Sequence, residues 1–424
     1  MSSFNFLHPG IGIKRWLGLG FVGITMAGMG VAGFLGIADP GPELVVRHYL
    51  ANCSLPTFIL LFVAGVSVCA YSFTMLHRNL IQGLTVPQET KNFASAYLQN
   101  RLLQRGPRIV TIGGGTGLST ILEGLKEHSA NLTAVVTVSD DGGSSGRLRK
   151  DLAILPPGDI RNCLVSLARR GPLLSGLLQH RFSKGEGLQG HSFGNLLIAA
   201  LTQITGNFLE AIRATSEVLA IAGEVLPATC QNVVLVARME DGSEIRGESK
   251  IPKAGSRIRD VYLDPPNAYP PQEVLDRIAN ADLILLGPGS LYTSVVPNLL
   301  VSGVADAVNR AEAPVVYISN IMTQPGETNE YSLAEHVHAL LHTTPLNRID
   351  AVLFNGRKIG EERLLNYERK GSHKVEVDED FRVRFDIKVI EEDLLSLDGL
   401  VRHDPRKTAA ALIKLLSKAP SSLA

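Results

Sequence analysis

The sequence has little cysteine, little charge and no excess of charge of either sign. Its four cysteines show no Cys-x-x-Cys spacing, so neither a disulfide scaffold nor a structural zinc site is expected. Lysine plus arginine total 41 and aspartate plus glutamate total 41, and this zero net charge argues against nucleic acid as a partner. Charged residues are 19% and hydrophobic residues 45% of the chain, which excludes intrinsic disorder. The 424 residues allow two or three domains.

Two long runs without a charged side chain lie near the N-terminus. Residues 16–37 and 54–76 are each long enough to cross, as a helix, a bilayer core of about 30 Å. The alternatives are a buried core helix and, for the first run, a cleaved signal peptide. Both are disfavoured, because the runs are long and follow each other closely. We therefore predict a membrane hairpin over residues 1–79 and a polar linker over residues 80–106.

Charged residues beside the two runs predict the orientation of the hairpin. Lys14 and Arg15 precede the first run, Arg78 follows the second, and the connecting residues 38–53 carry two acids and one arginine. Positive flanks stay on the cytoplasmic side. We therefore expect a multi-pass protein of the plasma (inner) membrane, with both ends and the large C-terminal domain in the cytoplasm.

Small residues recur at every fourth position of the first run, at Gly28, Ala32 and Gly36. This spacing lets two helices approach closely. The pattern fits packing on the second run and packing on another copy of the chain equally well.

Beyond residue 106 the sequence alternates apolar runs with helical segments. Five runs fit buried strands: residues 108–112, 132–138, 281–286, 315–319 and 351–354. Continuous apolar strands alternating with helices are typical of a parallel sheet covered on both faces. We predict an α/β domain with a parallel sheet over residues 107–424, which binds its ligand at the carboxyl ends of the strands.

One segment departs from this alternation. Two β-rich runs, residues 233–239 and 244–251, flank Asp241-Gly242, which is a strong hairpin-turn signal. A small antiparallel insertion is expected over about residues 225–265. Two more strands are expected near the C-terminus, at residues 374–377 and 381–389.

Glycine-rich loops follow several of the predicted strands. Glycine lets the backbone approach a phosphate, and a following helix offers free N–H groups at its positive end. The first loop has Leu118 where G-x-G-x-x-G requires its last glycine, and it lacks the lysine of a P-loop, so a dinucleotide-dependent oxidoreductase is disfavoured. The candidate ligand-binding residues in these loops are Gly113, Gly114, Gly115, Thr116, Gly117, Gly287, Gly289, Ser290, Thr293 and Asn320.

Three other loops carry charged and polar side chains. Asp140 and Asp141 follow a strand and suit a ribose hydroxyl or Mg²⁺, although they also fit a solvated turn. Asp159 fits either a helix cap before Ile160 or a ligand contact. His191 fits a structural role, a general acid or base, or a phosphate contact. The candidate residues are Ser139, Asp140, Asp141, Arg147, Asp159, Arg161, Asn162, His191 and Asn195, with Asp140 and Asp141 as candidate metal ligands.

Six segments occur here in the order of one known family. They are residues 112–117, 139–147, 156–162, 190–195, 286–298 and 320–328. Over about residues 106–418 the sequence closely resembles the bacterial gluconeogenesis-factor (YvcK/GlmR-type) proteins, within the larger superfamily of 2-phospho-L-lactate transferases (CofD-type). Many members lack the N-terminal hairpin.

This resemblance implies a Rossmann-like fold with one nucleotide cleft. It implies a regulator that binds a UDP-amino sugar and acts on cell-wall precursor supply and cell shape during gluconeogenic growth. An enzyme of cell-wall precursor synthesis is a candidate partner, and we expect a homo-oligomer. The alternative is a CofD-like transferase that moves a phospholactyl group onto a deazaflavin hydroxyl. Turnover is left open, no cofactor is assigned, and Mg²⁺ remains a candidate.

Overall fold

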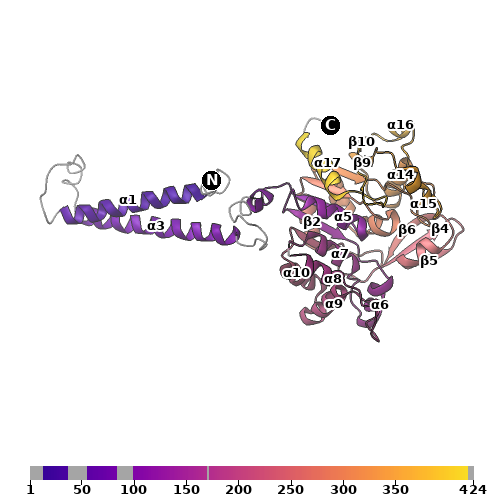
Figure 1. Cartoon of the computed structure of the whole chain (residues 1–424), viewed down its shortest axis with the longest axis horizontal. Helices are drawn as coiled ribbons and strands as arrows, with labels where there is room; N and C mark the ends of the chain where they lie inside the picture. The colour runs from indigo at the N-terminus through magenta and orange to yellow at the C-terminus, as the bar shows by residue number, and fades with distance from the viewer. Residues whose placement is uncertain (1–12, 37–54, 84–98, 170, 419–424) are drawn as a thin grey trace. The chain divides into compact units, whose positions relative to one another are not determined.

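The computed structural model describes residues 13–36, 55–83, 99–169 and 171–418 (Figure 1). The chain divides into two compact units, Met1–Leu102 and Leu103–Ala424, and each is described by itself below. We call the second unit the body; it begins at Leu103. The predicted linker is partly helical, since a helix of the first unit reaches Gly83 and residues 99–103 are helical. Residues 84–98 of the linker lie outside the described part.

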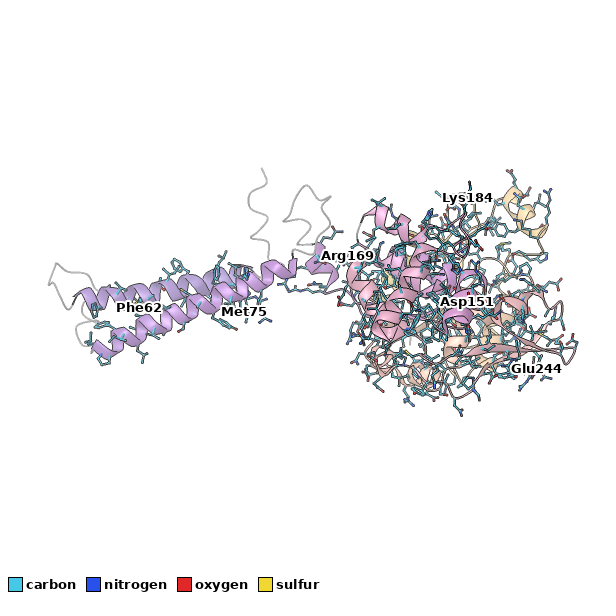
Figure 2. The ribbon with its side chains drawn as sticks, turned by 90° about the horizontal axis from the view of Figure 1, so that it is seen from below. Phe62, Met75, Asp151, Arg169, Lys184 and Glu244 are labelled. Atoms are coloured by element: carbon cyan, nitrogen blue, oxygen red, sulfur yellow. The ribbon has the colours of Figure 1, made fainter. Side chains whose placement is uncertain are left out.

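The first unit is a pair of apolar helices, α1 (Ile13–Gly36) and α3 (Leu55–Gly83). Within them, Arg15–Phe34 and Leu55–Arg78 are long and apolar enough to cross a membrane. Large apolar side chains lie on their outer surface, as Phe62 of α3 illustrates (Figure 2). Lipid is the solvent that such a surface suits. The predicted connecting loop, residues 38–53, lies outside the described residues.

Glycine allows α1 and α3 to pack backbone to backbone. A Cβ added to Gly65 would lie 2.4 Å from the Ala27 nitrogen, and one added to Gly30 would lie 2.7 Å from the Phe62 nitrogen. The predicted Gly28–Ala32 spacing falls on another face. A Cβ added to Gly28 would meet no described atom within 4 Å, and Ala32 is exposed. The surroundings of Gly36 lie outside the described residues.

The second unit is built on seven parallel strands in the order β10-β9-β8-β7-β1-β2-β3. The strands are β1 (Ile109–Gly113), β2 (Leu132–Val136), β3 (Glu224–Pro227), β7 (Leu283–Leu286), β8 (Val315–Ile318), β9 (Ala351–Asn355) and β10 (Lys388–Glu392). Every residue of β1, β2, β7, β8 and β9 is buried, which explains their continuous apolar runs. The five predicted central strands and the Rossmann-like class are confirmed.

The two edge strands differ from the prediction. β3 lies inside the segment predicted as an insertion but pairs with β2 in the main sheet. Residues 381–389 do not form one strand, because α16 (Phe381–Arg384) precedes β10. Lys374 makes only an isolated bridge with Met322. No residue of β10 is buried, so its sequence lacks the apolar run on which the prediction depended. β3 is largely buried, but its four residues are too few to give such a run.

Helices cover both faces of the sheet. They are α5 (Gly115–Leu125), α6 (Gly143–Leu152), α7 (Gly158–Leu167), α8 (Pro172–Gln179), α9 (Phe193–Thr205), α10 (Phe208–Leu219), α11 (Gln272–Ala279), α12 (Val296–Leu299), α13 (Val304–Arg310), α14 (Leu333–Thr343), α15 (Glu361–Glu368), α16 and α17 (Pro405–Lys418). The central helix α5 packs between α7 and α17. A Cβ added to Gly124 of α5 would lie 1.9 Å from the Pro405 oxygen, so α17 also requires glycine at its contact.

The antiparallel insertion is present as β4 (Val234–Met239), β5 (Glu244–Arg246) and β6 (Ile258–Asp264). β4 and β5 are joined through the predicted Asp241-Gly242 turn, and Gly242 has φ +86°. The predicted strand 244–251 ends early at Arg246. Gly247, at φ +107°, turns the chain there into the 3₁₀ helix η2 (Glu248–Lys253).

The packing of α1 on α3 can be tested through the fluorescence of a tryptophan that the chain already contains. Trp16 is the only tryptophan of the sequence, and its ring lies 5.9 Å from the Tyr71 ring of α3. We expect Gly65→Ala to lower the thermal midpoint of Trp16 fluorescence in detergent, because overpacking costs about 1–3 kcal/mol. Gly28→Ala, the control, should leave it unchanged or slightly raised. Equal midpoints for both variants would contradict the described packing.

Candidate functional site

The winding of the sheet reverses at β1. β2 and β3 lie on one side of β1, and β7 to β10 lie on the other. Gly113 is level with Val136 of β2, and Ile112 with Leu286 of β7, so the three strands end side by side. Loops that leave in opposite directions open a crevice at such a reversal. A cleft of about 460 Å³ lies here.

The lining of the cleft contains most of the predicted glycine-loop residues. Those predicted from sequence are Gly114, Gly115, Thr116, Gly117, Asp140, Asp159, Gly289, Ser290, Thr293 and Asn320. The lining residues that were not singled out include Thr137, Glu248, Gln324, Arg402 and His403. Gly113 and Gly287 lie at the ends of β1 and β7 but are not in the lining.

The two glycine loops touch through their backbones. A Cβ added to Gly117 would lie 2.6 Å from the Pro288 oxygen. A Cβ added to Gly114 would lie 2.7 Å from Asp159 Oδ2, and Gly115 has a left-handed φ of +66°. Helix α5 begins at Gly115, and no side-chain hydrogen bond caps it at Gly114. The positive dipole end of α5 therefore lies at the cleft, where its first N–H, that of Gly115, is hydrogen-bonded to the Asp159 carboxylate.

Asp159 is not the helix cap that the sequence suggested. Helix α7 starts at Gly158 with Pro157 at its N-cap, so Asp159 lies within the first turn. Its carboxylate instead accepts a hydrogen bond from the Gly115 N–H, which joins α7 to the first glycine loop. Burial raises the pKa of Asp159 to about 6; the Gly115 hydrogen bond opposes this rise and the charge of Asp140 adds to it.

Glu248 of the insertion reaches the same cleft. Burial raises its pKa to about 8, and repulsion from Asp140, Glu327 and Asp159 adds to this rise. Glu248 is therefore largely protonated at pH 7, and it places a neutral acid beside two carboxyl groups of the body. Sequence reasoning missed it because only the docked insertion brings it near the loops.

Asp140 and Asp141 have different surroundings. Asp140 lines the cleft, and its Oδ1 accepts a 2.8 Å hydrogen bond from the Gly142 nitrogen. Asp141 Oδ1 accepts a 2.9 Å hydrogen bond from the Ser249 nitrogen, and Gly247 leaves room for its other oxygen. Asp141 thus ties the insertion to the sheet, whereas Asp140 faces the cleft.

A buried glutamate lies behind one wall of the cleft. Thr293 donates a 3.0 Å hydrogen bond to Glu327 Oε1, while Glu327 Oε2 is buried and has no partner among the described residues. Burial raises the pKa of Glu327 to about 7. In the part of the chain that is described, no three His, Cys, Asp or Glu side chains are grouped to hold a metal ion. Mg²⁺ commonly takes one or two carboxylates and substrate phosphates, and Asp140 with Asp159 would supply that pair.

The remaining predicted residues form a polar network beside the cleft, outside its lining. Ser144 Oγ lies 2.9 Å from His191 Nδ1 and accepts a 3.1 Å hydrogen bond from Asn195. Arg161 donates to Asn195 Oδ1 at 3.0 Å, and also to Ser192 and Asn162. The pKa of His191 is lowered by burial and then by the charge of Arg147, which favours the neutral form of the ring. This network joins α6, α7 and α9.

The two other predicted residues have local partners. Arg147 donates to the Gln189 oxygen at 2.9 Å. Ser139 is buried, and its hydroxyl lies 2.9 Å from Thr137 Oγ1 at the end of β2. Neither is in the lining of the cleft, so a direct ligand contact for them stays a prediction.

Three lining residues come from the far C-terminal part of the chain, namely Val401 and the polar residues Arg402 and His403. Arg402 is the only lysine or arginine among the lining residues. His403 is buried and hydrogen-bonded to the Ser319 backbone, and burial lowers its pKa to about 4. Neither follows a glycine-rich loop, so no local signal marked them in the sequence.

These features define a doubly wound α/β protein with an open polar cleft at its topological switch point. The sequence profile of the 2-phospho-L-lactate transferase CofD family matches residues 109–395. The chain belongs to this family and, within it, to the gluconeogenesis factors, as the six ordered segments predicted.

Three known proteins illustrate the similarity. A putative gluconeogenesis factor of Nostoc sp. is 44% identical over 420 residues, which cover 97% of this chain and 92% of that one. The gluconeogenesis factor of Bacillus subtilis is 48% identical over 313 residues, which cover 74% and 99%. A crystal structure of a UPF0052-family protein from Bacillus halodurans matches with a TM-score of 0.70 at 45% identity, covering 73% and 99%.

The raised pKa of Glu248 predicts a pH-dependent stability. Its folded value of about 8 exceeds the unfolded value, so the stability it contributes is present at low pH and lost as pH rises through about 8. We expect Glu248→Gln to melt higher than the wild type at pH 9, and the two to converge near pH 4.5. Thermal unfolding across pH measures this, with the exposed Glu186→Gln as control. A constant difference at all pH values would contradict the assignment.

Proposed function

We propose that the cleft binds a nucleotide sugar of the UDP-amino sugar class and that the protein acts as a regulator of cell-wall precursor supply and cell shape. The observation that supports this most is the contact between two glycine loops at the switch point, the first of which contains the amino end of α5. Backbone amides at a helix start suit a diphosphate. The names of the relatives support the link to gluconeogenic growth.

The charges of the lining indicate how such a ligand would be held. Arg402 is a candidate partner for a phosphate, since guanidinium and phosphate oxygens form paired hydrogen bonds. Asp140 and Asp159 would repel a bare diphosphate but would share Mg²⁺ with it. A protonated Glu248 would donate a hydrogen bond to a sugar oxygen. We therefore propose Mg²⁺-assisted binding that weakens above pH 8, where Glu248 gains its charge.

A matched pair of glycine variants tests this proposal. Gly115→Val places a branched side chain in the cleft, and we expect at least a tenfold loss of affinity for UDP-N-acetylglucosamine, about 1.4 kcal/mol. Gly242→Val is the control, because Gly242 also has a positive φ but lies in the hairpin turn of the insertion. Calorimetry on the full chain in detergent with Mg²⁺ measures both. Unchanged affinity in Gly115→Val would remove this loop from the binding site.

We also propose that α1 and α3 anchor the protein in the plasma membrane with the body in the cytoplasm. The two apolar helices and the basic residues beside them support this. Protease added to right-side-out vesicles should leave the body intact and degrade it only after permeabilisation. Degradation in intact vesicles would overturn this topology.

A transferase function is the second candidate. It is favoured by the raised pKa values of Asp159 and Glu248, because a base that titrates near neutral pH suits removal of a proton from an acceptor hydroxyl. The family profile gives it further support. Formation of a phospholactyl-type diester with a deazaflavin acceptor would distinguish it from a purely regulatory role. A candidate protein partner remains an enzyme of cell-wall precursor synthesis, and a homo-oligomer remains expected.

A further inference from the structure

Residues 395–403 form a hairpin that supplies one wall of the cleft. Leu395 and His403 make an antiparallel bridge, and the Ser396 nitrogen donates to the Arg402 oxygen at 2.9 Å. Gly399 turns the chain with φ +92°. The match to the family profile ends at residue 395, so this wall hairpin lies beyond it.

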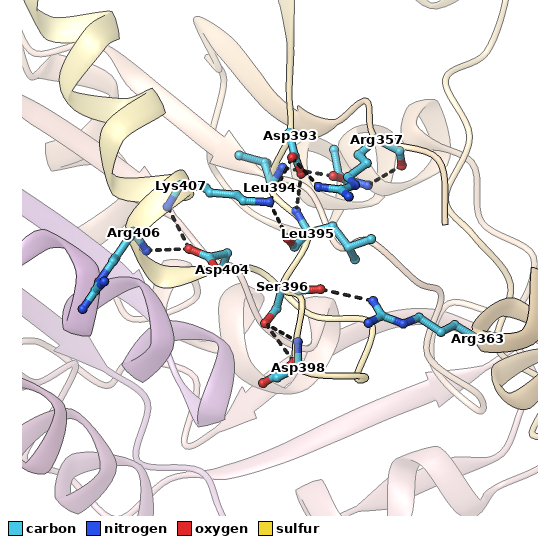
Figure 3. A network of polar contacts seen from close by, with 11 residues as sticks. Arg357, Arg363, Asp393, Leu394, Leu395, Ser396, Asp398, Asp404, Arg406 and Lys407 are labelled. Carbon is cyan, nitrogen blue, oxygen red and sulfur yellow. Dashed lines mark hydrogen bonds and ion pairs between the residues drawn. The ribbon is translucent and has the colours of Figure 1, made fainter. Parts of the chain in front are cut away.

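The base of the wall hairpin is fixed by charged side chains that lie away from its tip. Asp393 accepts hydrogen bonds from Arg357 at 2.7 Å and from Lys407 at 2.9 Å. Arg363 donates to the Ser396 oxygen at 3.2 Å, and Figure 3 shows these contacts converging on the segment. The base of the hairpin is therefore held by Asp393 and its partners, whereas Asp398 is hydrogen-bonded to Ser396 and to the Leu400 backbone at the tip.

Arg402, the only cation of the cleft lining, is already paired within this hairpin. Its guanidinium forms an ion pair with Asp398, four residues earlier in the sequence. The Ser396 hydroxyl donates a 2.8 Å hydrogen bond to the other oxygen of Asp398. Arg402 and then Ser396 lower the pKa of Asp398, so Asp398 is an anion at neutral pH.

The ion pair between Arg402 and Asp398 can be replaced by a contact between Arg402 and a ligand phosphate. The side chains of Arg402 and Asp398 are 56% and 40% exposed, and exposed ion pairs contribute little to stability. A phosphate can bind a guanidinium through two parallel hydrogen bonds in an arrangement stronger than a typical neutral hydrogen bond. A ligand with several negative charges can therefore displace Asp398, whereas a weakly charged ligand gains little.

We infer that Asp398 is an internal competing anion for Arg402, which lowers the affinity of the cleft for all anions and selects ligands of high negative charge. This inference rests on the proposed function, because it assigns Arg402 to a ligand phosphate. Asp398 is a specificity-determining residue that does not itself touch the ligand. Its carboxylate pairs with the guanidinium that the ligand phosphate would otherwise bind.

A purely structural role for Asp398 predicts the opposite effect. If Asp398 only shaped the hairpin, any change to it would loosen the wall and weaken binding. Asp398→Asn keeps the size of the side chain and an oxygen that can accept from Ser396, but removes the charge. The sign of the change in affinity therefore separates the two roles.

The chain offers a matched control at another hairpin turn. Asp241 also accepts a hydrogen bond from a serine hydroxyl two residues away, Ser243, at 2.6 Å. It has no arginine partner among its described contacts and lies in the insertion turn. Asp241→Asn removes an equivalent charge outside the cleft.

The test is calorimetry on the full chain in detergent, with UDP-N-acetylglucosamine and with inorganic pyrophosphate and phosphate as probes. We expect Asp398→Asn to bind the UDP-sugar two- to fivefold more tightly than the wild type at low salt, and Asp241→Asn to bind it equally. The gain should shrink as salt rises. The affinity for phosphate should rise in Asp398→Asn by at least the same factor as the affinity for pyrophosphate, because phosphate displaces Asp398 from Arg402 less readily.

The outcomes separate the two proposals. If the wild type binds the UDP-sugar and Asp398→Asn binds it equally or more weakly, the inference fails and the proposed function stands. If the wild type does not bind the UDP-sugar, the proposed function fails. The affinities for phosphate and pyrophosphate then test the role of Asp398. A higher affinity in Asp398→Asn supports the competing-anion role, and an unchanged or lower affinity overturns it.

Discussion

The reversal of winding between β1 and β7 is the constraint on which the rest of the body depends. Both strands end level with each other, and their following loops must separate within a few residues. They do so while in backbone contact, which leaves no room for a side chain at Gly117 beside Pro288. The same crowding applies at Gly114, where Asp159 of α7 closes against the loop. The cleft, its amide-rich floor and the position of Asp159 all follow from this packing.

The walls of the cleft come from two segments that the sheet itself does not require. The insertion is fixed to the body by Asp141 and delivers Glu248, and the C-terminal wall hairpin is fixed by Asp393 and delivers Arg402. The first carries an acid that burial keeps protonated, and the second carries a cation held by an internal anion. Protonated Glu248 and the Arg402–Asp398 ion pair therefore each carry no net charge until a rise in pH or a bound ligand changes them. An acidic cleft can in this way accept a charged ligand together with a metal ion.

The sequence predicted the central strands and the glycine loops because their signals are local. Apolar runs such as Leu283–Leu286 must be buried on both faces, and a glycine loop directly follows each of β1 and β7. It failed where the decisive contact is distant: Glu248, Arg402 and His403 reach the cleft only through docking of the insertion and the wall hairpin. β10 lacked a continuous apolar run, and β3 was too short to give one. The Gly28 spacing marks a face of α1 other than the one that packs on α3, so packing on another copy of the chain stays a prediction. His191 lies beside the cleft, outside its lining, and its contact with Ser144 gives it a place in a polar network that the sequence alone did not reveal.

The most direct measurement is a crystal structure of the protein with UDP-N-acetylglucosamine and Mg²⁺. We expect density for the diphosphate between the Gly113–Gly117 and Gly287–Ser290 loops, with the metal ion at Asp140 and Asp159 and the guanidinium of Arg402 turned from Asp398 to a phosphate. A second, larger groove of about 580 Å³ lies at the amino ends of the strands, beside Arg108 and Arg277. Ligand density in that groove, with none in the cleft at the switch point, would contradict the proposal that the cleft binds the nucleotide sugar.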